Sequence, residues 1–413
     1  MYTNILSGLD RNALYVYANI LNKNPLTIAT LMDMTQMPRT TLNRNIKELV
    51  DRELIKQEQA EISTGGRPPT LLSPNPNGLY TIGIELSRSR IRLVICNANI
   101  EPIWTYDYPM VKGSNAKRVL PSIFEILKES IDKFIPSKSR IIGIGVGAVG
   151  PMDLEEGRIL DVSSFPTQSW SNLDIKTMLY EEFHIPVYIA NGASTAAMGE
   201  YARRGGVDRY SLVYINVGIG LRCGVIWDGI LQNGEKDREG AFAHVVIEPG
   251  GRPCYCGSYG CVESYVTALA IVEDFKYEMR KGRDNIYRDR KNPSSIEFRD
   301  IYVAARKGDI LAREVMDRAS NYMGIFMANV INMLHPQVVV VGGMVPDMYP
   351  DYFGNAVNIA KGFIYGSSEL NPIFSTSLLG DNTIAIGAAA LVMLSYLEGD
   401  SLKEARVYDG REK

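Results

Sequence analysis

The stretch from His244 to Glu263, HVVIEPGGRPCYCGSYGCVE, is the strongest constraint on how this chain folds. It holds one histidine and three cysteines in a Gly-rich loop: His244, Cys254, Cys256 and Cys261. The whole chain has only five Cys and three His, so this clustering indicates a shared role. Imidazole and thiolates are ligands that tetrahedral Zn²⁺ prefers, and four of them complete a closed structural site. The sequence therefore predicts that a structural Zn²⁺ ion orders this loop.

A disulfide framework is the alternative interpretation of the cysteines. The odd number of Cys argues against it, as does a start with no basic segment followed by an apolar core. Cys96 and Cys223 lie outside the cluster and are expected to be small core residues. Reduced thiols and zinc together predict a cytoplasmic protein. No apolar run approaches about 18 residues, so we expect no membrane-spanning segment.

The composition limits how this chain could bind nucleic acid. Its 413 residues suffice for two or three domains, and 46% apolar and 22% charged residues are typical of a globular protein. The formal net charge is −3, so the chain has no global basic field. Any DNA contact must therefore come from a local patch.

The first ~75 residues are expected to form three short helices followed by a two-stranded hairpin. The helices are expected from the cap Asp10 to about Leu21, from Thr27 to Met34 and from Arg39 to Arg52, with the break Thr35–Pro38 before the third. The hairpin is expected from Leu54–Lys56, Ile62–Arg67 and Leu71–Leu72. This order is that of a winged helix-turn-helix.

The third helix presents polar side chains opposite its apolar face. Leu42, Ile46 and Leu49 recur at helical spacing, and no acidic residue lies between Met34 and Lys47. Arg, Asn and Thr are side chains that hydrogen-bond base edges and phosphates. We predict DNA contacts from this helix and from a minor-groove arginine in the segment GGRPP: Arg39, Thr40, Thr41, Asn43, Arg44, Lys47 and Arg67. The alternatives are a protein-interaction module and, for GGRPP, a stiff linker.

From residue 79 onward, strands alternate with helices, which predicts an α/β architecture. The segment SPNPNG at 73–78 is expected to be a linker. Strands are expected at 80–86, 90–96, 141–146, 187–190, 212–217, 224–227 and 338–341, and helices at 117–134, 173–183, 193–203, 264–281, 310–334 and 384–396. Only three residues separate the first two strands, so they form a hairpin and the sheet is mixed. A similar order after Tyr210 predicts two related lobes with a cleft between them.

These features together resemble the ROK family of repressors, open reading frames and sugar kinases. The resemblance is carried by His244 with CYCGSYGCVES, GGRP at 65–68, GVGAVGPMD at 145–153, INVGIG at 215–220, VVVVGGMV at 338–345 and IGAAAL at 386–391. It covers essentially the whole chain and is closest to the branch of the xylose and N-acetylglucosamine repressors. It implies an actin-like, sugar-kinase-type fold with sugar and nucleotide in the cleft. The expected domains are the winged helix 1–72, the linker 73–78, a first lobe 79–190 and a second lobe 191–413 that carries the zinc loop and the C-terminal helix.

The family's catalytic base is missing from this chain. In family kinases an Asn-Asp pair supplies the general base, whereas here Asn191 is followed by Gly192. Glycine cannot accept a proton, and a positioned base contributes roughly 10²- to 10⁴-fold to the rate. No Asp or Glu between Ile185 and Met198 replaces it.

Both phosphate loops of the family are altered as well. The Asp-x-Gly-Gly-Thr turn becomes Glu85-Leu86-Ser87-Arg88-Ser89, which retains no glycine for a close approach to phosphate. In the second loop, Arg222 stands where family kinases have glycine. We therefore expect no enzyme activity, and the alternative is an ATP-dependent sugar kinase.

The family's sugar site is partly retained. The family's Glu-x-Gly-His becomes Ala241-Phe242-Ala243-His244, which removes one carboxylate. Asn191, His244 and Glu263 remain, and amides and carboxylates suit the hydroxyls of a sugar or sugar derivative. The alternative is a regulator that binds no small molecule. The expected partners are operator DNA, such an effector and further copies of the chain in a homodimer or tetramer.

Overall fold

The computed structural model describes residues 2–59, 68–154, 156–160, 165–205, 210–232, 241–288, 292–366 and 371–398. The chain forms two compact units: unit 1 comprises Met1–Arg209 with Asn382–Lys413, and unit 2 comprises Tyr210–Asp381. The predicted second lobe, 191–413, therefore differs from unit 2 at both ends. The two segments that the prediction misplaced contain helices that pack on the sheet of unit 1.

The N-terminal residues form the predicted winged helix-turn-helix. Its helices are α1 (Arg11–Asn22), α2 (Ile28–Thr35) and α3 (Arg39–Asp51), and its sheet has the order β1 (Leu26–Thr27), β3 (Thr70–Pro74), β2 (Ile55–Gln59). The side chain of Asp10 caps α1 by accepting from the amide of Ala13, and Thr27 caps α2. Gln36 adopts a left-handed conformation with φ of 54°, which ends α2 before Pro38 starts α3. The predicted strand Ile62–Arg67 lies outside the described residues.

The predicted linker 73–78 is part of the folded structure. Ser73 and Pro74 end strand β3, where Pro74 pairs with Ile55 at the last position of the ladder. Asn75 then donates its backbone amide to the carbonyl of Leu54 at 2.9 Å and its side-chain amide to the carbonyl of Glu53 at 2.7 Å. The expectation of a free linker was wrong because a terminal proline costs the strand no ladder bond.

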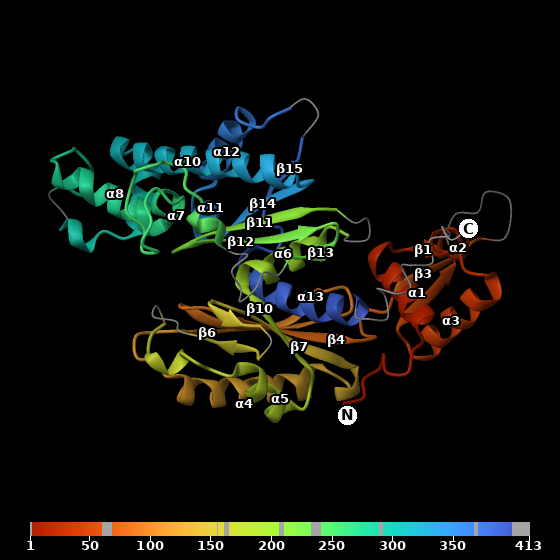
Figure 1. Ribbon diagram of the computed structural model, residues 1–413. Coiled ribbons are helices and arrows are strands. Elements are labelled where there is room, and N and C mark those ends of the chain that lie inside the picture. The colour runs from red at the N-terminus through yellow and green to blue at the C-terminus, as the bar shows by residue number, and fades with distance from the viewer. Residues whose placement is uncertain are drawn as a thin grey trace. The chain divides into compact units, whose positions relative to one another are not determined.

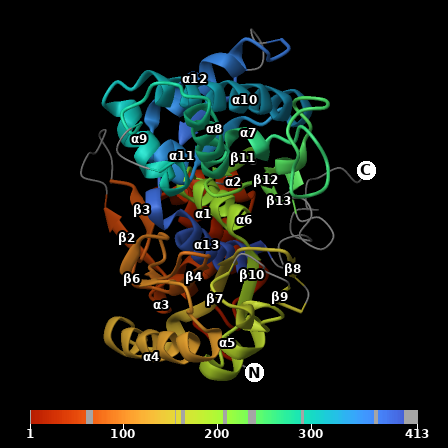
Figure 2. The ribbon, with the colours of Figure 1, turned by 90° about the vertical axis from the view of Figure 1, so that its left-hand side faces the viewer.

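The winged helix is followed in unit 1 by a five-stranded mixed sheet. Its order is β10 (Val187–Asn191), β7 (Ile141–Ala148), β4 (Tyr80–Leu86), β5 (Arg90–Cys96), β6 (Pro102–Pro109). Strands β10, β7 and β4 are parallel, whereas β4–β5 is the predicted antiparallel hairpin. Helices α4 (Ala116–Phe134) and α5 (Ile175–Phe183) lie on one face of this sheet (Figures 1 and 2). A small ribbon of β8 (Met152–Asp153) and β9 (Arg158–Ile159) follows β7.

The other face of this sheet carries α6 (Gly192–Arg203) and α13 (Thr383–Glu398). Glycines set how closely they pack: a Cβ at Gly83 would lie 1.9 Å from the carbonyl oxygen of Ala385, and one at Gly145 would lie 1.9 Å from that of Ala388. Gly387 approaches the carbonyl of Thr195 in α6 equally closely. Residues Gly380–Leu397 are long and apolar enough to cross a membrane by length and composition, but 61% of this stretch is buried, as in a core helix.

Unit 2 is built on a second five-stranded sheet. Its order is β13 (Ile230–Leu231), β12 (Leu221–Trp227), β11 (Leu212–Val217), β14 (Val338–Gly342), β15 (Ile373–Thr376). One buried cluster joins this sheet to α7 (Glu263–Val266), α8 (Ala268–Arg280), α9 (Phe298–Arg306), α10 (Ile310–Leu334) and α12 (Pro350–Lys361), and α11 (Met344–Met348) follows β14. The long helices α10 and α12 pack against each other (Figure 1).

Several local features of these elements can be compared with what the sequence predicts. The expected helix 264–281 is divided at Thr267, which turns extended and caps α8 through the amide of Ala270. His335 and His184 are left-handed C-caps of α10 and α5. Cys96 and Cys223 are buried core residues, and burial raises the pKa of the Cys96 thiol to about 12.

Helix α13 packs on the sheet of unit 1 by direct backbone contact, so one methyl group added at this contact should strongly lower the stability of the protein. Gly145→Ala should lower the free energy of unfolding by about 2–4 kcal/mol, because the new Cβ overlaps a backbone oxygen that cannot rotate away. Gly354→Ala in α12 is the matched control, since a Cβ there meets nothing within 4 Å and should stabilise by about 0.5–1 kcal/mol. Denaturant unfolding of both variants measures the difference, and equal stability would contradict the close packing.

Candidate functional sites

The four predicted metal ligands lie together in unit 2. Their ligand atoms are all within 4.8 Å of one another. Cys254 Sγ lies 3.6 Å from His244 Nδ1, and Cys256 Sγ lies 3.7 Å from Cys261 Sγ. A tetrahedral zinc ion with ordinary bond lengths gives edges of roughly 3.6 Å for S···N and roughly 3.8 Å for S···S. These two separations match the edges of one tetrahedral site, so the cluster could hold a metal ion.

Backbone contacts shape the loop that carries these ligands. Cys254 and Cys261 stand in short antiparallel pairings, Cys254 donating its amide to Ser258 at 2.8 Å and Cys261 opposing Val246. Gly260 has φ of +74°, and a Cβ there would lie 1.8 Å from the carbonyl oxygen of Glu248. Only glycine fits at that point, so the loop closes on itself by direct backbone contact.

Two side chains of the loop anchor it to the neighbouring helices. Glu248 accepts a hydrogen bond from the hydroxyl of Tyr322 in α10 at 2.7 Å, which holds the pKa of that carboxyl below its usual value. Arg252 forms a fork with Asp274 in α8, at 2.7 and 3.0 Å, and its guanidinium lies 4.5 Å from the ring centre of Tyr265. The loop is thus attached to α7, α8 and α10 independently of any metal.

Glu263 follows the metal loop and faces the turn between β11 and β12. Its Oε1 accepts from the amide of Leu221 at 3.1 Å, and a Cβ at Gly220 would lie 2.7 Å from the same oxygen. Its Oε2 is buried and has no partner at ordinary hydrogen-bonding distance and angle within the described part of the chain, and the Tyr255 hydroxyl lies near the same carboxylate. A buried acceptor without a donor is costly in a folded protein, so this oxygen is suited to a ligand donor.

Tyr255 and His244 lie on the same side of unit 2 as Glu263. The rings of His244 and Tyr255 are 5.4 Å apart and meet edge to face. Burial and the charge of Glu263 raise the pKa of Tyr255 to about 12, and Arg222 acts in the opposite direction. Tyr255 and Arg222 are therefore additional polar groups beside Glu263. Sequence reasoning missed the role of Tyr255, since a tyrosine inside a metal loop carries no separate signal.

Asn191 lies in unit 1, apart in the chain from His244 and Glu263 of unit 2. It is 1% exposed, and its side-chain oxygen accepts from the amides of Ala193 and Ser194, each at 2.9 Å. Asn191 is therefore the N-cap of α6, a structural use that the sequence prediction did not include. Gly192 is the first residue of α6, and no carboxylate stands at either position.

The altered first phosphate loop is a tight hairpin between β4 and β5. The Arg90 guanidinium donates to both oxygens of Glu85 at 3.1 Å, and the backbone amide of Ser87 donates to the carbonyl of Arg90 at 3.0 Å. In unit 2, the amide of Leu221 donates to Glu263 and that of Gly218 to the carbonyl of Gly220. The backbone amides of Ser87, Gly218 and Leu221 in these two loops are thus engaged within the protein.

The outer face of α3 is the candidate nucleic-acid interface. Arg39, Thr40, Asn43, Arg44 and Lys47 are exposed there, Thr41 is half-buried, and Arg67 lies outside the described residues. Arg44 forms an ion pair with Asp10 at 3.2 Å, with 67% of its side chain exposed. This pair orients the guanidinium toward the start of α1, and the guanidinium has further N–H donors for a second acceptor.

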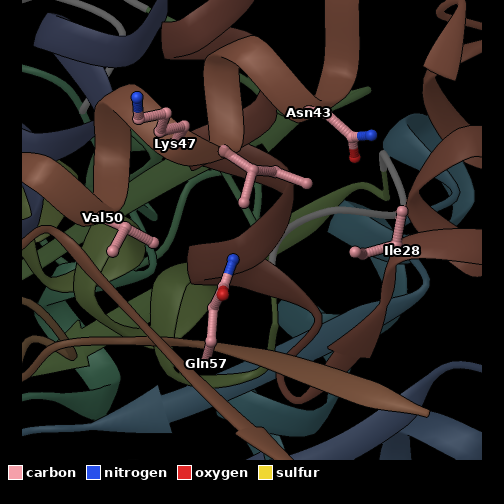
Figure 3. Close-up of a pocket in the computed structure, with 6 residues that line it drawn as sticks. Ile28, Asn43, Lys47, Val50 and Gln57 are labelled. Carbon is pink, nitrogen blue, oxygen red and sulfur yellow. The ribbon is translucent and has the colours of Figure 1, made fainter. Parts of the chain in front are cut away.

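A shallow hollow of about 290 Å³ opens beside this face (Figure 3). Ile28, Ile46 and Val50 form its apolar part, and three polar side chains complete it: Asn43 and Lys47 from α3 and Gln57 from β2. None of these six residues is acidic. Sequence reasoning missed Gln57, because only the fold brings β2 beside α3.

The chain belongs to the ROK family, whose profile matches residues 81–394. A MarR family profile matches residues 7–61 of the winged helix. The xylose repressor of Caldicellulosiruptor bescii is 28% identical over 395 residues, which are 94% of this chain and 97% of the relative. The DNA-binding transcriptional dual regulator NagC of Escherichia coli is 24% identical over 94% of this chain and 93% of its own. The resemblance drawn from the sequence motifs is therefore confirmed.

Solved structures agree with this assignment at the level of the fold. A ROK family transcriptional regulator, a homologue of the Escherichia coli Mlc protein, matches 95% of this chain and 98% of its own with a TM-score of 0.77 at 22% identity. A ROK family glucokinase from Streptomyces griseus, solved with glucose and AMPPNP, matches 76% of this chain and 98% of its own with a TM-score of 0.61 at 24% identity. Both matches support the predicted actin-like α/β fold.

The ion pair between Arg252 and Asp274 predicts that removing Arg252 lowers the stability of the protein by an amount that depends on pH. Arg252→Ala should cost about 1–3 kcal/mol at pH 7, because it leaves Asp274 charged and largely buried. Burial already raises the pKa of Asp274, and removing Arg252 raises it further. A carboxyl whose folded pKa lies above its unfolded value loses stability as pH rises through that interval, so the cost should shrink toward pH 4.

Arg283→Ala is the control for this measurement. Arg283 pairs with Glu314, and both side chains are 44% exposed, so its loss should cost under about 1 kcal/mol. Thermal unfolding of both variants at pH 7 and pH 4 tests the assignment. Equal costs for the two variants, or a cost for Arg252→Ala that grows in acid, would show that the fork does not hold the loop.

Proposed function

We propose that this chain is a sugar-responsive transcriptional repressor. The winged helix binds operator DNA, and the ROK domain senses a sugar without phosphorylating it. The observation that carries the proposal is a MarR-type winged helix, whose α3 has no acidic residue from Arg39 to Lys47, joined to a ROK domain without the kinase base. Relatives that match over nearly their whole length are a xylose repressor and the regulator NagC.

The same domain is not expected to transfer phosphate. Gly192 cannot take a proton from a sugar hydroxyl, and the hairpin that replaces the first phosphate loop is closed by Arg90 and Glu85. Restoring a carboxylate alone should therefore leave the protein inactive. A Cβ at Gly192 would meet Ile384 at 3.3 Å, so Gly192→Asp is tolerated with a small shift.

The proposed effector contacts in unit 2 are Glu263 and His244, and Asn191 of unit 1 stays a prediction from the sequence. Glu263 supports this assignment with its buried, unpartnered oxygen, because a sugar hydroxyl is a suitable donor. His244 serves the metal and orients the loop, and Asn191 caps α6. Relatives named for xylose and N-acetylglucosamine support a sugar or sugar derivative as the ligand class.

We further propose a structural zinc ion, a homodimer or tetramer, and a cytoplasmic location. Thiolate and imidazole donors at tetrahedral spacing favour Zn²⁺ over oxygen-seeking cations. A single winged helix gains affinity and specificity by binding a second half-site as a dimer. Free, reduced cysteines fit a reducing compartment.

The zinc assignment predicts one metal ion per chain. Cys256→Ser should lower metal content and melting temperature, because three ligands hold a zinc ion less tightly than four. Cys223→Ser is the control, since this buried cysteine lies outside the ligand cluster. Elemental analysis of the wild type, Cys256→Ser and Cys223→Ser measures the zinc content of each protein. Full zinc content in Cys256→Ser, or a stable wild-type protein without zinc, would refute the zinc site.

The proposed DNA face predicts two different effects. Lys47→Ala should weaken binding to all sequences and reduce the salt slope by about 1, because it removes one phosphate contact. Gln57→Ala should weaken binding without changing the salt slope, since it removes an uncharged donor from the hollow. Titrations of a duplex selected by the full chain, at several salt concentrations, measure both. Lys361→Ala, which removes one positive charge from unit 2, is the control for Lys47→Ala. An equal change in the salt slope for both variants would contradict the assignment of α3 as the DNA-binding face.

The effector proposal predicts a response to a neutral or phosphorylated sugar. D-Xylose, N-acetylglucosamine and their phosphates should be screened by thermal shift, where ligand at 100 times its Kd stabilises by about 2.7 kcal/mol. The sugar that binds should change operator affinity by a free energy of about 1–3 kcal/mol. Glu263→Gln should abolish the shift while the operator still binds. Sugar binding that leaves operator affinity unchanged would refute the coupling.

A further inference from the structure

Helix α13 takes part in two buried regions of unit 1. Its first half is seated on the sheet, where Gly83 and Gly145 admit the carbonyls of Ala385 and Ala388. Its second half contributes Val392, Met393 and Leu397 to a core that the winged helix largely forms, with Ala98 and Ile142 of the lobe as further members. The winged-helix residues of this core include Leu14, Val16, Tyr17, Ile20, Leu42 and Leu49. One helix therefore belongs both to the ROK lobe and to the interior of the DNA-binding module.

The residues before α1 also connect the DNA-binding module to the ROK lobe. The hydroxyl of Tyr396 in α13 donates to Asn4 Oδ1 at 3.3 Å. The amide of Ile5 donates to the carbonyl of Ser139 at 2.7 Å, and the hydroxyl of Tyr2 donates to that of Lys138 at the same distance. The N-terminal segment is thus bonded both to α13 and to the residues that lead into β7.

A second segment of the module is bonded to the lobe as well. Arg140 forms an ion pair with Glu53 and donates to the carbonyl of Gly78 at 2.9 Å. The amide of Ala98 donates to the carbonyl of Pro76 at 3.0 Å. The module is therefore held through two of its segments and through a common core, rather than by a single strand of chain.

At its other end, α13 is in backbone contact with α6. A Cβ at Gly387 would lie 1.9 Å from the carbonyl oxygen of Thr195, which leaves no room for the two helices to slide. Helix α6 starts at Gly192, directly after its cap Asn191, one of the proposed effector contacts. A displacement at the start of α6 must therefore displace α13.

We infer that α13 couples α6, whose cap Asn191 is a proposed effector contact, to the DNA-binding module, with Met393 and Tyr396 as the positioning residues of the joint between α13 and the module. The module moves with the lobe as one body, and α6 and α13 carry the displacement to α1 and α3. The inference rests on the proposed function for its ligands but not for the joint itself. Because coupling is reciprocal, DNA bound at α3 must also change the stability of α6.

The contact between α13 and the core of the DNA-binding module is tested first, in the full chain without ligands. Hydrogen exchange of peptides from α1 and α3 is measured relative to peptides from β4. Met393→Ala should raise this ratio roughly tenfold or more, because it opens the shared core on the module's side. Leu391→Ala is the matched control: this residue is buried in the same helix, 8% exposed, but lies outside the shared core. An unchanged ratio in Met393→Ala, or the same rise in both variants, overturns the joint.

The coupling is tested with a duplex selected in vitro by the full chain. Bound duplex should slow amide exchange in α6 several-fold in the wild type and in Leu391→Ala. Met393→Ala should lose this effect while still binding the duplex, and Tyr396→Phe should weaken it. A wild-type α6 whose exchange does not respond to bound duplex overturns the coupling. Failure to select any duplex would instead refute the proposed DNA binding, and the ligand-free comparison would still decide the joint.

Discussion

The packing of α13 on the glycines of strands β4 and β7 is the contact on which most of unit 1 depends. Backbone carbonyls of the helix meet the sheet where Gly83 and Gly145 have no side chain. Contacts of this kind cannot be adjusted by rotating a side chain, so they fix the helix in position and direction. The position of α13 in turn fixes α6 on one side and the core of the winged helix on the other.

Glu248 and Arg252 attach the loop that carries the His/Cys cluster to helices α10 and α8. Its four ligand atoms lie within 4.8 Å of one another, so the cluster could also hold a metal ion. The same loop leads directly into Glu263, whose carboxylate sits against the β11–β12 turn. A metal ion bound there would position this carboxylate without taking part in any reaction.

The features that argue against phosphoryl transfer are local and leave the fold intact. Glycine at position 192 fits the first turn of α6, and the Arg90–Glu85 fork gives the hairpin after β4 a compact end. Neither feature disturbs the strands that support it. The proposed loss of phosphoryl transfer is therefore compatible with a retained kinase-type fold.

The sequence by itself determined the elements and motifs whose signals are local. The spacing of Cys254, Cys256 and Cys261, the apolar periodicity of α3 and the bounds of β4 and β5 could all be read from neighbouring residues. Tertiary structure alone decided that residues 73–78 are held in place, that α13 belongs to unit 1 and that Gln57 lies beside α3. These facts depend on contacts between segments far apart in the chain, and neither periodicity nor turn chemistry encodes which distant surface a segment packs against.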